Sequence, residues 1–115
     1  MNKLTKLNKL KNALAKFVAI LELDPNCQWT KGFKSDLSRC EELIQNGYTA
    51  DDLRSLSSSI TYVFKGMGSF NDYGPGIYHP ETGRYSPIPG TENFDKIKNE
   101  VFDLAILLRA IEPTA

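Results

Sequence analysis

The side chains that most often carry enzyme chemistry are scarce in this sequence of 115 residues. It has one histidine, His79, and two cysteines, Cys27 and Cys40. A structural zinc site needs about four ligands at close spacing, and a nucleophilic triad needs a base beside its nucleophile. Neither pattern is present, so we expect a solvated His79 and reduced cysteines, with Cys40 buried on an apolar helix stripe. The sequence predicts no catalytic residue, no metal site and no cofactor.

Acidic residues occur in two adjacent pairs, Glu41–Glu42 and Asp51–Asp52. Neighbouring residues on a helix point in different directions, so neither pair is a preformed acid–base site. One interpretation is solvated surface, with Asp51 and Asp52 placed favourably in a first helical turn. The other is an acidic surface that also includes Asp36 and that binds a basic partner.

Residues 66–90 differ in composition from the rest of the chain, because they contain six of its eight glycines and four of its six prolines. No helical or strand period is sustained there, yet several aromatic residues argue against a disordered linker. We predict a long ordered loop with one short hairpin around Pro80-Glu81-Thr82-Gly83. Loops of this length are usually functional or mobile.

The loop begins with Gly66-Met67-Gly68-Ser69, which lacks the spacing and the following Gly-Lys-Ser/Thr of a phosphate-binding loop. We interpret it as a structural turn in which Gly66 ends a helix and Gly68 allows a tight bend. Ser69 or Asn71 would then hydrogen-bond nearby backbone groups.

The same loop holds the residue types that dominate tight protein interfaces, namely tyrosine, arginine and a few charges. We predict that its partner-binding residues are Asp72, Tyr73, Tyr78, Glu81, Arg84 and Tyr85. The alternative interpretation is a loop that packs only on itself.

Four amphipathic segments must position these residues, because apolar side chains recur at steps of three and four. The stripes cover residues 4–21, 29–44, 53–64 and 94–111. Gly47 is predicted to end the second helix, Thr49 to cap the third and Thr91 to cap the fourth. The last stripe is the broadest, so we expect its helix to be the most central. The predicted fold class is all-α: a single domain, residues 1–115, forming a small four-helix bundle-like structure with a long ordered loop between helices three and four.

The net charge is zero, with 14 basic and 14 acidic residues, which argues against a dedicated nucleic-acid-binding protein. The charge is uneven, since residues 1–21 carry five lysines and no acid. A lysine-rich solvated helix face explains this, and a basic docking face is the alternative. No apolar run reaches 18 residues and no secretory signal pattern is present, so we expect a cytoplasmic protein that does not bind membranes.

The segment Gly66-Met67-Gly68-Ser69-Phe70-Asn71-Asp72 resembles the signature turn of a family of small bacterial helical proteins of unassigned biochemistry. In that family a helix opens with a tryptophan, as Cys27-Gln28-Trp29 does here, and a final amphipathic helix closes the domain. The resemblance covers about residues 25–110, and the loop after Asp72 is longer here. Such proteins are similar to the immunity proteins encoded beside bacterial toxins, including those of contact-dependent growth inhibition.

The resemblance implies a non-enzymatic immunity protein that neutralises one cognate toxin domain, a nuclease being favoured because an acidic inhibitor suits a basic groove. Two alternatives stay open. One is a small enzyme or ligand-binding protein that uses residues 66–90 as a lid, with a pocket lined by Tyr78, His79 and Arg84. The other is an adaptor whose basic first helix docks on a partner or a membrane.

Overall fold

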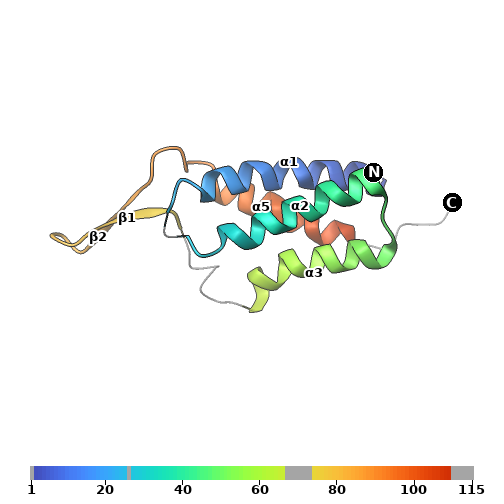
Figure 1. The fold of residues 1–115 in the computed structure, drawn as a ribbon. Helices are drawn as coiled ribbons and strands as arrows, with labels where there is room; N and C mark the ends of the chain where they lie inside the picture. Colours follow the sequence, from blue (N-terminus) through green and yellow to red (C-terminus); the bar gives the residue numbers. More distant parts are fainter. Residues whose placement is uncertain (1, 26, 67–73, 110–115) are drawn as a thin grey trace.

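The computed structural model describes residues 2–25, 27–66 and 74–109. Over these ranges the chain forms the helices α1 (Lys3–Leu21), α2 (Thr30–Asn46), α3 (Ala50–Gly66) and α5 (Phe94–Leu108) and the strands β1 (Gly76–His79) and β2 (Arg84–Pro87). The helices lie roughly along one axis, and the strands project from one end of them (Figure 1). The four predicted helices are confirmed, but the all-α class holds only in part, because β1 and β2 form a two-stranded antiparallel sheet within the predicted loop.

Each outer helix of the bundle packs on the same two neighbours. Helix α1 contacts α2 and α5, and α3 contacts these same two helices. The buried face of α1 is the longest, with nine buried residues from Lys6 to Leu21, against six on α5. The fourth predicted helix is therefore not the most buried one. Its broad stripe is only partly used, since Phe102 and Ile106 are half-buried and Leu107 is exposed.

Aromatic rings join all four helices at the end of the bundle from which the hairpin projects. Phe17 of α1 meets Phe33 of α2 edge-on, with ring centroids 5.0 Å apart, and stacks on Phe94 of α5 at 5.6 Å. Phe33 also meets Phe64 near the end of α3, and Phe64 contacts Phe102 at 5.0 Å. Because edge-on and offset stacked rings add to the energy of burial, this cluster stabilises the packing of the four helices at that end of the bundle.

Local capping explains where several helices begin and end. Asn2 accepts a hydrogen bond from the Thr5 backbone N–H, which starts α1. Gly47 follows α2 with φ of 94°, a conformation that favours glycine, as predicted. The Thr49 cap is also confirmed, because its Oγ1 accepts from the Asp52 backbone N–H at 3.1 Å. The Asp52 carboxylate in turn accepts a hydrogen bond from the Thr49 backbone N–H at 2.8 Å, which completes a capping box.

The predicted cap at Thr91 is wrong, because α5 begins three residues later, at Phe94. The Thr91 hydroxyl instead donates to the Ile88 carbonyl at 2.6 Å, and its own carbonyl accepts from the Phe94 N–H. These bonds connect the end of β2 to the start of α5. Thr91 is therefore part of the base of the hairpin.

The buried polar residues of the described ranges include Asp36 and Ser57, which lie between helices. Asp36 of α2 is 7% exposed and accepts a hydrogen bond from Ser59 of α3 at 2.7 Å. Burial raises the pKa of the Asp36 carboxyl, and the Ser59 bond opposes that rise only partly. Ser57, fully buried on α3, donates to the Ala105 carbonyl and accepts from Arg109. Both groups fix how α3 sits against its neighbours, because an unpaired buried polar atom is costly.

The two cysteines are not bonded to each other, and Cys40 is fully buried, as predicted. Burial raises the pKa of the Cys40 thiol to about 12. None of the described helices combines the length and apolar character needed to cross a membrane.

Candidate protein-binding site

The hairpin forms because its turn residues fit a tight reversal of the chain. The His79 carbonyl accepts from the backbone N–H groups of Thr82, at 3.2 Å, and Gly83, at 2.9 Å. Proline at the second position suits such a turn, since its φ is fixed near the required value. Gly83 closes the loop with φ of 68°, where a side chain would be strained. The predicted hairpin around Pro80–Gly83 is thus confirmed.

The register of β1 and β2 determines which side chains lie on the same face of the hairpin. Tyr78 lies opposite Tyr85, and Ile77 lies opposite Ser86. Side chains alternate along a strand, so Tyr78 and Tyr85 share one face of the sheet, which we call the tyrosine face. Their ring centroids are 5.0 Å apart. The sequence could not show this pairing, because it depends on where the turn falls.

The opposite face is polar apart from Ile77. His79 lies opposite Arg84, and the His79 Nε2 atom is 2.8 Å from the Ser86 hydroxyl. The Glu81 carboxylate is 3.9 Å from His79 Nδ1. Because Arg84 and Tyr78 are on opposite faces, the pocket predicted from Tyr78, His79 and Arg84 is not assembled.

The hairpin is exposed on the tyrosine face and free of helix contacts. Tyr78 is 52% exposed and Tyr85 is 74% exposed. Neither strand packs against any of the described helices. Ile77, which we did not predict as a contact residue, is also exposed. A β-branched and an aromatic residue, Ile77 and Tyr78, stand next to the predicted turn, and this pattern is the sequence signal that could have indicated a strand with Ile77 on it.

The structure describes only some of the other residues predicted in this segment. Asp72 and Tyr73, and the turn residues Gly68, Ser69 and Asn71, lie outside the described ranges. Gly66 is the last residue of α3, in agreement with its predicted role as a helix end. Glu81 lies in the hairpin turn and is exposed.

The acidic surface is at the far end of the bundle. It consists of Glu41, Glu42, Asp51 and Asp52, around the connection from α2 to α3, whereas the hairpin leaves the other end (Figure 1). The inclusion of Asp36 in this surface was wrong, because its side chain is buried against α3. Helix α2 has 17 residues, which corresponds to about 25 Å. The two predicted binding surfaces are therefore not brought together.

Arginine side chains neutralise much of this acidic surface. Arg39 bridges Glu42 at 2.9 Å and Asp52 at 3.2 Å, and Arg54 pairs with Asp51. The capping bonds from Thr49, with Arg39 adding a smaller effect, hold the pKa of Asp52 below its usual value. These side chains form a helix-start network, so the surface is less negative than the carboxylates alone suggest.

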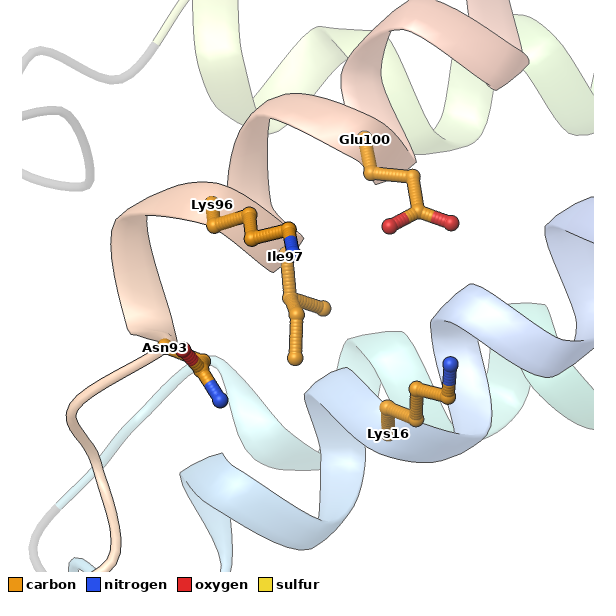
Figure 2. Close-up of a pocket in the computed structure, with 5 residues that line it drawn as sticks. All are labelled: Lys16, Asn93, Lys96, Ile97 and Glu100. Atoms are coloured by element: carbon orange, nitrogen blue, oxygen red, sulfur yellow. The ribbon is translucent and has the colours of Figure 1, made fainter.

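A separate hollow of about 250 Å³ lies between α1 and α5. Figure 2 shows Lys16 on one side of it and Asn93, Lys96, Ile97 and Glu100 on the other. Only Ile97 is buried, and the four polar residues are exposed. Exposed lysines and a single apolar side chain form a surface hollow without the enclosed, mostly apolar lining of a typical ligand pocket.

Within the ranges that the structure describes, no group of three or more His, Cys, Asp or Glu residues is placed to hold a metal ion. No family model, no curated protein and no solved structure matches this chain. The candidate site therefore rests on the geometry of the hairpin.

Proposed function

We propose that this protein is a non-enzymatic inhibitor of the immunity type, which binds a toxin domain through its hairpin and blocks the active site or the substrate groove. The observation that carries the proposal is the exposed tyrosine face on an arm that projects from a rigid bundle. The resemblance of the Gly66–Asp72 segment to small helical bacterial proteins supplies the toxin as the partner class.

The arm has the properties of an inhibitory element. Tyrosine offers a large contact area with only two side-chain torsions to immobilise, so it supplies binding energy at a low entropic cost. Two tyrosine rings in tilted contact on a narrow hairpin would fit a groove that is too narrow for the bundle. Arg84, on the polar face, and Glu81, in the turn, would contact the walls of that groove.

The acidic surface has a secondary role in this proposal. It lies far from the arm and is partly neutralised by Arg39 and Arg54. Charges outside the contact region act mainly on the rate of encounter. We therefore assign Glu41 and Glu42 to steering a basic toxin and assign the retention of that toxin to the hairpin.

The test uses the toxin domain encoded by the neighbouring gene. Tyr78→Ala and Arg84→Ala should each speed dissociation of the complex, with Tyr78→Ala costing at least about 2 kcal/mol if the residue is a hot spot. Reversing the charges of Glu41 and Glu42 together should slow association and reduce its salt dependence. Stopped-flow or surface-plasmon measurements separate the two rates.

Tyr62→Ala is the matched control, because Tyr62 is 65% exposed but lies on helix α3 rather than on the arm. It should leave both rates unchanged. The proposal is wrong if cells that make the protein gain no protection from the toxin. If the Tyr78→Ala variant protects the cells as well as the parent protein does, the protein is still an inhibitor, but the hairpin is not the surface that contacts the toxin.

A further inference from the structure

Three side chains of the hairpin form a series of hydroxyl, imidazole and carboxylate groups. The Ser86 hydroxyl oxygen is 2.8 Å from Nε2 of His79, and the Glu81 carboxylate is 3.9 Å from Nδ1 of the same ring. The two contacts therefore use opposite nitrogens of one imidazole. This is the connectivity by which a histidine takes the proton of a nucleophilic hydroxyl, and it recurs on unrelated folds.

The fold of the hairpin brings the three residues together. His79 ends β1, Ser86 is in β2, and Glu81 is in the turn that joins the strands. Ser86 lies opposite Ile77, two residues before His79, so Ser86 and His79 are diagonal neighbours on the polar face. The sequence could not show this arrangement, because it depends on the register of the strands.

The carboxylate determines which atom donates in the contact between Ser86 and His79. A neutral imidazole carries its proton on one of its two nitrogens. The negative charge of Glu81 favours the proton on Nδ1, so Nε2 accepts and the Ser86 hydroxyl donates. The lone pairs of the Ser86 oxygen then stay available to an electrophile. A separation of 3.9 Å is longer than a hydrogen bond, so Glu81 acts on the ring through its charge.

We propose that Ser86 is a nucleophilic hydroxyl that is acylated by activated carboxylic esters, with His79 as its general base and Glu81 as a positioning residue. The Ser86 oxygen bonds to the carbonyl carbon of the ester, and the bond between that carbon and the leaving alcohol breaks. The Ser86 proton passes to Nε2 of His79 and from there to the departing alkoxide. The products are an acyl-serine and a free alcohol.

The surroundings of Ser86 suit an ester. Ile77, directly opposite, is 45% exposed and offers an apolar contact for the acyl chain. Arg84 is on the same face, two residues before Ser86, where its positive charge favours the negative charge that develops on the carbonyl oxygen. None of the described helices packs on the strands, and the His79 side chain is 41% exposed, so an ester can reach both groups.

Acetylation of the full chain by p-nitrophenyl acetate tests the assignment. Peptide mapping by mass spectrometry should locate an acetyl group on Ser86, and the time course of this label gives its rate. Ser86→Ala should abolish the label. His79→Gln should slow it by about 100-fold or more, the usual contribution of a general base. In the parent protein the rate should rise with pH between about pH 5 and 8, where histidine loses its proton.

Ser55 is the matched control within the same molecule. It is an exposed serine on α3, and the sequence has no second histidine to serve it as a base. It should be acetylated far more slowly than Ser86. Glu81→Gln should slow labelling of Ser86 by a smaller factor than His79→Gln, and Glu81→Asp should restore it, because Asp returns the charge.

The backbone amide signals of residues 76–87 in nuclear magnetic resonance spectra show whether each variant keeps the hairpin. The inference is overturned if Ser86 is acetylated no faster than Ser55. It is equally overturned if a variant that keeps the hairpin, His79→Gln or Glu81→Gln, is labelled at the parent rate at every pH. The experiment contains no toxin, so its outcome is independent of the proposed function.

Discussion

The helical bundle and the hairpin hold their residues by different means. In the bundle, fully buried side chains such as Phe17, Leu14 and Ile60 belong to one hydrophobic core, and the buried side-chain polar atoms of the described residues are hydrogen-bonded. In the hairpin, order comes from one turn, one strand pair and one tyrosine contact. Since apolar burial is the dominant favourable term in folding, nearly all of the folding free energy resides in the bundle.

This difference indicates how the molecule can combine stability with binding. Contact residues on the arm can change without loss of the fold, because none of them contributes to the core. Conversely, the aromatic cluster at the base of the arm cannot change freely. Its rings hold together the four helices from which the arm projects.

The largest expected effect is in the aromatic cluster. Phe17→Ala removes a fully buried ring that contacts Phe33 and Phe94, and should lower the free energy of unfolding by about 3–5 kcal/mol. Urea denaturation followed by far-ultraviolet circular dichroism measures the change. A loss below 1 kcal/mol would mean that the cluster does not hold the bundle together.

A smaller effect, an increase in the free energy of unfolding, is expected when the buried carboxyl of Asp36 is replaced. Its folded-state pKa is raised, so its contribution is most favourable below about pH 3.8, the ordinary value, and is lost as the pH rises through the folded-state pKa. Asp36→Asn keeps an acceptor for Ser59 and removes the buried charge. It should stabilise the protein at pH 7 by about 1–2 kcal/mol, with no gain at low pH.

Denaturation midpoints of the parent and of Asp36→Asn at several pH values test this. Ser59→Ala serves as the companion variant, because it removes the hydrogen bond that Ser59 donates to the carboxyl and should destabilise the protein at pH 7. Equal stability of the parent and Asp36→Asn at every pH would contradict the assignment of a raised pKa.

The smallest effect is expected on the arm itself. Tyr85→Ala should change the global unfolding free energy by less than about 0.5 kcal/mol, because the side chain is 74% exposed and its ring lies against that of Tyr78. Hydrogen exchange at the backbone amides of residues 76–87 should nevertheless become faster. A large loss of global stability would show that the arm and the bundle fold as one unit.

Much of the bundle was predictable because helices depend on local features. The three- and four-residue spacing located all four helices, and Gly47 and Thr49 were correctly assigned as helix stop and cap. The hairpin was also located, since Pro80 and Gly83 suit a tight turn. The start of α5 was not, because the Thr91 hydroxyl bonds backward to Ile88, a contact that its residue type alone does not determine.

The candidate site was predictable only in its composition. The sequence by itself determined that tyrosines and an arginine would be concentrated between the third helix and the last, and that acids would surround the connection between α2 and α3. Only the tertiary structure decided that Tyr78 and Tyr85 share a face while Arg84 takes the other, and that the acidic surface lies at the opposite end. The physical reason is that residue spacing sets local periods, whereas strand register and helix packing depend on contacts between residues far apart in the chain.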